Sequence, residues 1–256
     1  MNDVLERIGR FTSSQIWKLT TKDRKGIDFG APALTYIEEK RAERTLGRSI
    51  DLGKGSSSTV WGQLMEYYCH KYELGLEYTL CSKTTLVHQK YKFWSGSPDF
   101  TKINTTGDIK CFEPKRFYVF SMNLMKLENG LISLDEFKKE EKEIYWQVVS
   151  NCILTGNSKG EFIVYTPTEK QLLEIIEDWE VDNYVSGLNK TLSEHLGLEF
   201  QYVHYLLRKP MYELPFIPEK IEFPNCTKVE IEIPTDDIIS LTKCVISAEK
   251  ILTDEL

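Results

Sequence analysis

The strongest constraint on the fold of this chain is a change of hydrophobic period along residues 84–165. Residues 84–112 contain short runs rich in Val, Phe, Tyr and Trp, a composition typical of β-strands. Residues 133–155 then repeat apolar side chains at helical spacing, and the apolar run at 162–165 predicts a buried strand. Strands, one long helix and another strand together indicate a mixed α/β core.

Local signals refine this pattern. Ser133 and Glu136 have the spacing of a capping box at the start of the long helix, and Gly156 is placed to end it. The strand-like stretch predicts a β-meander with its connection near residues 102–107. Segment 112–132 fits a strand or another core segment, whereas the Pro-punctuated stretch after 207 fits no clear element. Further helices are predicted at 3–20 (two helices around a turn), 33–45, 58–74, 170–186 and 189–207.

The composition suits a folded protein rather than a membrane or secreted one. The chain has 256 residues, 41% of them hydrophobic, which is enough to bury a sizeable core. No window approaches the roughly 18 consecutive apolar residues of a membrane span, and residues 1–10 lack the hydrophobic run of a secretory signal. We therefore expect a soluble cytoplasmic protein without a membrane partner.

The cysteines and histidines do not favour a zinc or iron–sulfur site. Six cysteines are scattered without a C-x-x-C pair, and the four histidines form no cluster in the sequence. In a reducing compartment, such thiols act most simply as small, partly buried hydrophobic groups.

Charge is distributed unevenly along the chain, whose formal net charge is −7. Residues 1–130 contain 20 Lys and Arg against 15 Asp and Glu, whereas residues 131–256 contain 12 against 24. A nucleic-acid surface needs only a local positive patch, so the first half can provide one and the second half is a poor candidate. Charge alone is equally compatible with a merely acidic, solvated C-terminal region.

A short motif in the strand-like stretch carries the chemistry. Residues 97–99 (Ser-Pro-Asp) and 108–110 (Asp-Ile-Lys) are separated by eight residues. Side chains alternate along a strand, so Asp108 and Lys110 point to the same face, and a meander can bring Asp99 beside them. Carboxylates this close repel each other unless a hard divalent cation lies between them, and Mg²⁺ prefers oxygen ligands. On this motif alone, a surface hairpin with an Asp–Lys pair is an equal alternative.

Glu66 is an unusual member of the predicted helix 58–74. It lies close to the apolar stripe of this helix rather than squarely opposite it. A carboxylate near a core face usually has a partner or a metal. An ordinary exposed glutamate is the alternative that the spacing leaves open.

The motif fits the pattern PD-x(n)-(D/E)-x-K and resembles the PD-(D/E)XK nuclease superfamily. Over about residues 4–167, the chain is similar to the lambda-exonuclease and YqaJ-type viral recombinase branch of that superfamily. Four blocks in the family's order carry the resemblance: 7–16 (RIGRFTSSQI), 61–66 (WGQLME), 97–99 with 108–111 (SPD and DIKC), and 145–148 (YWQV) with 155–156 and the strand at 162–167. The resemblance implies a restriction-endonuclease-like α/β core, a central mixed β-sheet flanked by helices. It implies a single nuclease domain over 1–256, in which 168–256 form a helical or irregular extension of unassigned role.

The resemblance also implies a metal site. Asp99 and Asp108, with the backbone carbonyl of Ile109 and the side chain of Glu66, would bind Mg²⁺ or Mn²⁺. In this branch of the family, the acidic residue before x-Lys is more often glutamate. Asp108 is one methylene shorter, which leaves the metal geometry open without excluding activity.

Other positions would handle water and phosphate. Lys110 would position the attacking water, and Gln147 would lie near the nucleophile or the scissile phosphate. Arg7, Ser14 and Ser97 match the family's 5′-phosphate pocket, in which a guanidinium and hydroxyl groups bind phosphate oxygens. For Arg7 and Ser14, a plain surface charge and a helix cap are the alternatives.

The implied activity is digestion of one strand of linear duplex DNA from its 5′ end. This leaves a 3′ single strand for a recombinase or a single-strand-annealing partner. Homotrimeric rings occur in the family, whose members are bacterial or phage-encoded. Lys115, Arg116 and the aromatics around them are further candidates for contacting DNA.

Three other interpretations stay open. The same core also serves endonucleases of repair or restriction. A Cas4-type nuclease is a second possibility, although the missing cysteine cluster argues against it. The third is a DNA-binding protein with a nuclease-like fold and no catalysis. The presence of Asp99, Asp108 and Lys110 argues against it.

Overall fold

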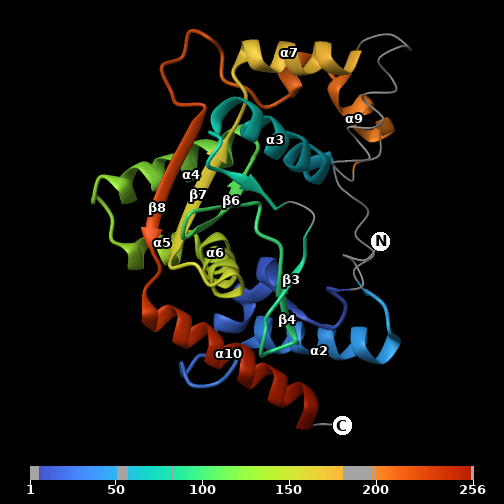
Figure 1. Ribbon diagram of the computed structural model, residues 1–256, viewed down its shortest axis with the longest axis vertical. Coiled ribbons are helices and arrows are strands. Elements are labelled where there is room, and N and C mark those ends of the chain that lie inside the picture. The colour runs from blue at the N-terminus through green and yellow to red at the C-terminus, as the bar shows by residue number, and fades with distance from the viewer. Residues whose placement is uncertain (1–5, 51–56, 82–83, 181–197, 199, 255–256) are drawn as a thin grey trace.

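The structure is a computed structural model that describes residues 6–50, 57–81, 84–180, 198 and 200–254. Its central sheet consists of β2 (Thr79–Leu80), β5 (Phe100–Lys102), β6 (Thr105–Lys110), β7 (Lys159–Tyr165) and β8 (Cys226–Glu232). These strands lie in the order β2-β5-β6-β7-β8. Strands β6 and β7 are parallel, and the other neighbouring pairs are antiparallel. The mixed α/β architecture predicted from the sequence is therefore confirmed (Figure 1).

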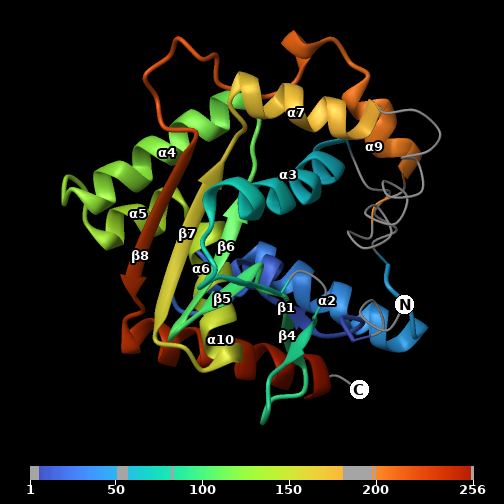
Figure 2. The same cartoon turned by 45° about the horizontal axis from the view of Figure 1, so that its top comes forward.

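Helices cover both faces of this sheet (Figures 1 and 2). In β7 the buried side chains of Phe162 and Val164 point to one face, and those of Ile163 and Tyr165 point to the other. The first face packs against α4 (Pro114–Glu128), α5 (Leu134–Glu140) and α6 (Lys142–Thr155). The second face packs against α3 (Ser57–Glu73), α7 (Glu169–Glu180) and α9 (Phe200–Leu207). Two hydrophobic cores, here called the first and second core, thus lie on either side of one sheet.

A smaller sheet adjoins the first core. It is built from β1 (Phe11–Thr12), β4 (Trp94–Gly96) and β3 (Leu86–Val87), in that order. The 3₁₀-helix η1 (Ser13–Thr20) and the helices α2 (Ala31–Leu46) and α10 (Thr235–Asp254) pack around it, in the lower part of Figure 1. The helices predicted at 33–45 and 58–74 are α2 and α3 and are confirmed.

The predicted meander is divided between the two sheets. Strands β3 and β4 pair in the smaller sheet, and β5 and β6 pair in the central one. Residues 97–99 form the junction between them. The connection predicted near 102–107 is a tight turn in which Asn104 has a left-handed backbone with a φ of 57°. The motif residue Asp99 therefore lies where the chain passes from one sheet to the other.

The helix pair predicted at 3–20 is wrong in its first half. From residue 6 onward, the described chain forms turns up to residue 10, then β1, and only Ser13–Thr20 is helical. The amide of Phe11 donates to the carbonyl of Phe93 at 2.8 Å, and the ring of Phe11 is fully buried. Pairing with β4 and burial thus outweigh the local helical pattern.

The long helix predicted over 133–155 begins and ends where expected but is broken in the middle. Both hydrogen bonds of the capping box between Ser133 and Glu136 are present. Gly156 ends the helix in a left-handed conformation with a φ of 77°. Between these ends, the backbone leaves helical geometry at Glu141, which has a φ of −118°. The predicted helix is therefore two helices, α5 and α6.

Segment 112–132 contains the helix α4 rather than a strand. Glu113 caps its start by accepting hydrogen bonds from the backbone amides of Lys115 and Arg116, and Pro114 occupies the first turn. The guanidinium of Arg116 forms an ion pair with Glu141, which is buried at the break between α5 and α6. The break lets this carboxylate turn inward and meet α4.

Residues beyond 167 complete the same sheet and core. Strand β8 pairs with β7 along its whole length, and α10 contributes Leu241 and Val245 to the first core. Helices α7 and α9 coincide with parts of the predicted helices 170–186 and 189–207, whose remaining portions at 181–197 and 199 lie outside the described residues. In the described part of the chain, no helix is both long and apolar enough to cross a membrane.

Phe162 tests the packing of the first core. Its fully buried ring lies between those of Phe137 and Tyr145, with centroid distances of 5.2 and 6.3 Å. Because Phe162→Ala leaves a cavity, we expect the free energy of unfolding to fall by about 3 to 5 kcal/mol in urea denaturation. Leu173→Ala on the exposed side of α7 is the control, with an expected change within about 0.5 kcal/mol. Equal losses for the two variants would contradict this packing.

Candidate functional site

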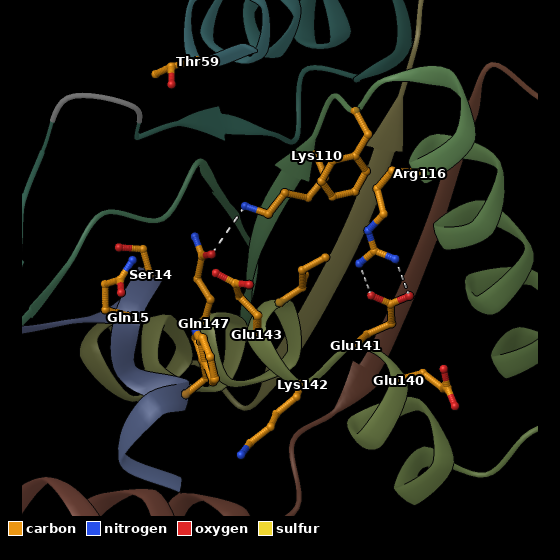
Figure 3. Close-up of a pocket in the computed structure, with 13 residues that line it drawn as sticks. Ser14, Gln15, Thr59, Lys110, Arg116, Glu140, Glu141, Lys142, Glu143 and Gln147 are labelled. Carbon is orange, nitrogen blue, oxygen red and sulfur yellow. Dashed lines mark hydrogen bonds and ion pairs between the residues drawn. The ribbon is translucent and has the colours of Figure 1, made fainter. Parts of the chain in front are cut away.

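The candidate site lies at the C-terminal end of β6, on the face that α6 covers. Asp108 and Lys110 occupy this face, as strand alternation predicts, and their charged groups form an ion pair. Gln147 of α6 joins both of them. Its Nε2 donates to Oδ1 of Asp108 at 2.6 Å. Its Oε1 accepts from Nζ of Lys110 at 3.4 Å, a contact drawn in Figure 3. These three side chains form a closed triangle of polar contacts.

The junction between the two sheets brings Asp99 to this triangle. Oδ2 of Asp99 accepts a hydrogen bond from the backbone amide of Ile109 at 2.7 Å. The amide of Asp99 donates to the carbonyl of Gly107 at 3.2 Å, and its carbonyl accepts from the amide of Cys81 at 2.8 Å. Backbone and side chain together fix this carboxylate beside β6.

Glu66 approaches from α3, on the other side of the sheet. Its half-buried side chain lines a cavity together with Ile109 and Lys110. Burial raises the pKa of Glu66 to about 7, the ammonium of Lys110 opposes this shift, and the carboxylate of Asp108 adds to it. Its partial burial and these charged neighbours do not fit the alternative of an ordinary exposed glutamate.

The charges in this group do not balance. Burial, followed by the carboxylates of Asp108 and Glu66, raises the pKa of Asp99 well above its usual range. Burial opposes the charged form of Lys110, but the carboxylates of Asp108 and Asp99 outweigh it and raise the pKa of this lysine. Lys110 is therefore a firmly charged donor, and three carboxylates share it.

This donor set fits a divalent cation by its chemistry. Carboxylate and carbonyl oxygens are the ligands of Mg²⁺, and a cation would relieve the repulsion that raises the pKa of Asp99 and Glu66. In the part of the chain that the structure describes, no group of three or more His, Cys, Asp or Glu side chains is arranged to hold a metal ion. Magnesium does not require one, because it is commonly bound by one or two carboxylates while water and substrate phosphate fill its other positions.

A surface groove opens onto these residues. A cavity of about 910 Å³ is lined by Lys110 and Gln147 and, across from them, by Ser14 of η1 (Figure 3). A second cavity of about 690 Å³ shares Lys110 and is lined by Glu66. A third, of about 840 Å³, shares Ser14 and is lined by Arg7. Because neighbouring cavities share lining residues, the three follow one another from Arg7 past the triangle to Glu66, and this row of cavities is called the groove below.

The residues of the predicted 5′-phosphate pocket are only partly brought together. Arg7 is exposed in the turn before β1, and Ser14 lies between it and the triangle. Ser97 follows β4, and its hydroxyl lies 3.2 Å from that of Thr85, which precedes the neighbouring strand β3. The grouping of Ser97 with Arg7 and Ser14 stays a prediction, as do their roles toward phosphate.

A polar network that was not predicted from the sequence lies beside the junction between the two sheets. Oγ of Ser150 in α6 lies 2.8 Å from Oγ of Ser13 and accepts a hydrogen bond from the indole of Trp94 at 2.8 Å. A Cβ at Gly96 would lie 2.0 Å from Oγ of Ser13, so this network leaves room only for glycine. The available signal was the polar pair Ser150-Asn151 within an otherwise apolar helix face.

The sequence suggests Arg116 only as a candidate for contacting DNA. In the structure, its side chain lines the groove. It lines the cavities of 910 and 690 Å³, and its guanidinium lies over the rings of Phe112 and Phe120 at 5.1 and 5.5 Å. Together with the ion pair to Glu141, visible in Figure 3, these rings hold a positive charge at the edge of the groove. A DNA contact by Arg116 stays a prediction.

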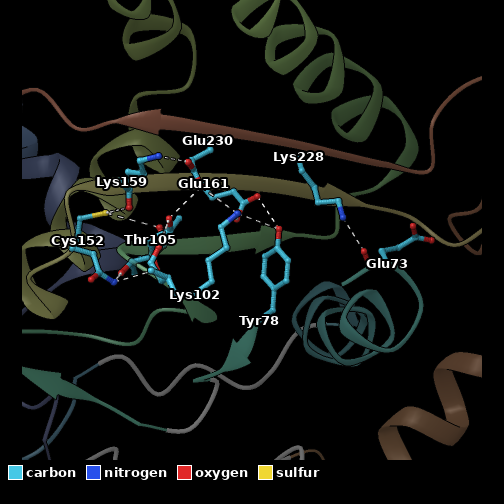
Figure 4. Close-up of polar contacts among 12 residues, drawn as sticks. Glu73, Tyr78, Lys102, Thr105, Cys152, Lys159, Glu161, Lys228 and Glu230 are labelled. Carbon is cyan, nitrogen blue, oxygen red and sulfur yellow. Dashed lines mark hydrogen bonds and ion pairs between the residues drawn. The ribbon is translucent and has the colours of Figure 1, made fainter. Parts of the chain in front are cut away.

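A second acidic cluster, on the α3 face of the sheet, has a different character (Figure 4). The buried Glu161 accepts a hydrogen bond from the hydroxyl of Tyr78 at 3.0 Å and pairs with Lys102 at 2.9 Å. Lys102 also pairs with Glu230 at 3.1 Å, and Lys159 pairs with Glu230 at 2.8 Å. Lys159 also lies 3.6 Å from the exposed Glu232, so every carboxylate here has a lysine partner and the cluster is a structural network that ties β5, β7 and β8 together.

Comparison with known proteins gives structural neighbours but no sequence family. No family model and no curated protein matches this chain. Two structures of the alkaline exonuclease LHK-Exo from Laribacter hongkongensis, one of them in complex with dAMP, each have a TM-score of 0.60 at 14% identity, over 99% of this chain and 93% of the LHK-Exo chain. A phage-related exonuclease from Haemophilus somnus 129PT has a TM-score of 0.58 at 14% identity, over 95% of this chain and 93% of its own. The chain shares the fold of these exonucleases, in agreement with the PD-(D/E)XK-like core predicted from the sequence.

The raised pKa of Glu66 makes the stability of the metal-free protein depend on pH. The folded state holds this proton more tightly than the unfolded chain, since its pKa is about 7 against an ordinary 4.5. The associated stability is complete below 4.5 and is lost as the pH rises through 7. Glu66→Gln cannot ionise at this position and does not lose this stability. In EDTA, the free energy of unfolding of the variant minus that of the wild type should therefore increase as the pH rises through this window.

Urea denaturation of both proteins at about pH 5 and about pH 7.5 measures this gain. Glu177→Gln, on the exposed side of α7, is the control and should show no such gain. A Glu66→Gln difference that is the same at both pH values would contradict the burial-induced shift.

Proposed function

We propose that this chain is a metal-dependent DNA exonuclease of the lambda-exonuclease and YqaJ type. In this proposal it digests one strand of linear duplex DNA from a 5′-phosphorylated end and leaves a 3′ single strand. The observation that carries the proposal is the convergence of Asp99, Asp108, Lys110 and Gln147 at the end of β6, within a fold shared with exonucleases.

The acidic residues would hold the cation. Asp99 and Asp108, with the carbonyl of Ile109 and with Glu66, supply hard oxygen donors for Mg²⁺ or Mn²⁺. When bound, such a cation lowers the pKa of water and offsets the negative charge that develops on the phosphate.

Lys110 and Gln147 then act on water and phosphate. Because the pKa of Lys110 is raised by its acidic neighbours, its ammonium stays protonated and orients the attacking water as a hydrogen-bond donor. The amide of Gln147 already bridges Lys110 and Asp108, and it can exchange either contact for one to the scissile phosphate. Positioning and charge, rather than proton abstraction by Lys110, are the contributions that this geometry favours.

The groove suggests how a 5′ end is selected. Arg7 and Ser14 lie along it on the side away from Glu66, so a strand seated on the triangle can extend toward them. A terminal phosphate carries more negative charge than an internal phosphodiester, and a guanidinium with a hydroxyl binds it preferentially. Polarity would then follow from binding of the end rather than from the chemistry of the triangle.

The substrate and partners in this proposal follow from the same resemblance. The substrate is double-stranded DNA with free ends. A single-strand-annealing recombinase would receive the 3′ strand, and a homotrimeric ring would keep the enzyme on its strand. These partners suit a bacterial or phage-encoded enzyme that acts in recombination in the cytoplasm.

Digestion of a linear duplex that carries a 5′ phosphate on one strand only tests the activity. We expect Mg²⁺-dependent loss of the phosphorylated strand, no digestion in EDTA, and an intact closed circular control. Cutting of the circle would replace the proposal by an endonuclease with the same core. Cleavage of neither substrate would leave a DNA-binding protein without catalysis.

Asp108 tests the metal role directly. Asp108→Asn keeps the shape of the side chain but removes a charged oxygen donor, so we expect the rate of digestion to fall by about 100-fold or more while duplex binding persists. The rise in melting temperature that Mg²⁺ gives the wild type should also disappear. Glu177→Gln is the control with the same type of change on an exposed helix, and it should retain both properties. A variant as active as the wild type would rule Asp108 out as a ligand.

Arg7 tests the preference for 5′ phosphate. Removing a charge-assisted contact of this kind costs about 1.5 to 3 kcal/mol, so Arg7→Ala should reduce the preference for phosphorylated over hydroxyl ends by about 10-fold or more. Paired digestions of the two substrates measure the ratio. Arg24→Ala, which removes an equally exposed charge elsewhere in the N-terminal region, should leave the ratio unchanged. Equal digestion of both ends by the wild type would remove the phosphate pocket from the proposal.

A further inference from the structure

The Glu66 end of the groove is bounded by the C-terminal half of the chain. The cavity that Glu66 and Lys110 line is also lined by Leu206 at the end of α9, by Lys209, and by residues 213–215 at the end of the short 3₁₀-helix η2 (Met211–Glu213) and just after it. These residues belong to segment 168–256, to which the sequence assigns no role. They lie beside the N-terminal end of α3, as the neighbouring positions of α3 and α9 in Figure 2 show.

Three tyrosines next to these lining residues face the solvent. Tyr202, Tyr205 and Tyr212 are 53%, 74% and 81% exposed. The opposite side of α9 is buried in the second core. Residues three apart are neighbours on a helix, so Tyr202 and Tyr205 form one aromatic strip along its outer side. Tyr212 lies in η2, directly before the lining residue Glu213.

Positive charge accompanies the tyrosines. Arg208 is exposed directly after α9, and Lys209, four residues beyond Tyr205, lines the cavity. Two adjacent cations are notable here because residues 131–256 contain only 12 Lys and Arg against 24 Asp and Glu. Exposed tyrosines and cationic side chains thus follow one another along residues 202–212, and Lys209 among them reaches the cavity.

We propose that this surface binds unpaired DNA next to the active site. The surface consists of Tyr202, Tyr205, Arg208, Lys209 and Tyr212 and is called the tyrosine wall below. Exposed rings on which bases stack, combined with cations that pair with the backbone, are the usual composition of a single-strand binding surface. Because every base has an aromatic face, such binding is tolerant of sequence.

The inference rests on the proposed function. An enzyme that digests one strand of a duplex has unpaired nucleotides beside its active centre, and Lys209 of the tyrosine wall lines the same cavity as Glu66 and Lys110. Bases in an intact duplex are stacked on each other and cannot stack on exposed rings. The wall should therefore distinguish single-stranded from double-stranded DNA.

Binding of a fluorescently labelled oligothymidylate to the full-length protein tests the wall. The measurement is made by anisotropy in EDTA, so no cleavage interferes. Stacking contributes about 1 to 3 kcal/mol per base, so the double variant Tyr205→Ala with Tyr212→Ala should bind at least about 5-fold more weakly if one ring stacks a base, and about 30-fold or more if both rings do. The variant Tyr205→Phe with Tyr212→Phe keeps both rings and should restore wild-type affinity. Ile239→Ala removes a side chain of α10 that is 45% exposed, and this control should bind like the wild type.

The outcomes separate this inference from the proposed function. A loss confined to single-stranded DNA supports the wall, and it does so even if the protein fails to cleave any substrate. Unchanged affinity, or an equal loss for a blunt duplex, overturns the wall while leaving the exonuclease proposal intact. If the alanine variant does not fold by circular dichroism, Arg208→Gln with Lys209→Gln carries the test. Removal of two phosphate contacts should then reduce the slope of log affinity against log salt by about 1.4, and an unchanged slope overturns the inference.

Discussion

The site depends on an electrostatic conflict that the fold imposes. Asp99, Asp108 and Glu66 come from the sheet junction, from β6 and from α3, and they share the single ammonium of Lys110. Left alone, such groups would separate or become neutral. They stay together because each is anchored by contacts that do not involve charge, such as the backbone hydrogen bonds of Asp99 and the packing of α3 and α6 on the two cores. Rigid packing thus maintains an arrangement that a divalent cation would relieve.

The parts of the site that could be predicted from the sequence lie on regular elements. Asp108 and Lys110 share a face because a strand has a period of two, and Glu66 stands near the apolar stripe of its helix because a helix has a period of 3.6. These periods fix the direction of a side chain without knowledge of its partners. Asp99 is a different case, because its place followed from the idea that a hairpin would return the chain, and β5 and β6 form that hairpin.

The features that could not be predicted are decided by partners distant in sequence. Phe11 forms a strand because its amide donates to the carbonyl of Phe93. The helix breaks at Glu141, where this carboxylate pairs with Arg116 of another helix. Strand β8 alternates apolar and charged residues between two prolines, which is the pattern of a half-buried strand, but its place at the edge of the sheet is decided by its pairing with β7. The groove belongs to the same class, since its three cavities combine η1, β6, α3 and the α9–η2 region.

The two acidic clusters of the central sheet show why composition alone does not identify a site. Both contain carboxylates and lysines, and both involve neighbouring strands. Around Glu161, each carboxylate has a lysine partner and a tyrosine hydroxyl donates to Glu161, so nothing further is needed there. Around Asp108, one lysine faces three carboxylates, and the burial of Glu66 and Asp99 leaves them too costly to ionise together. That imbalance can be recognised only when charges are counted in space, and it makes the end of β6 the place on this sheet where a cation and a phosphate would complete the structure.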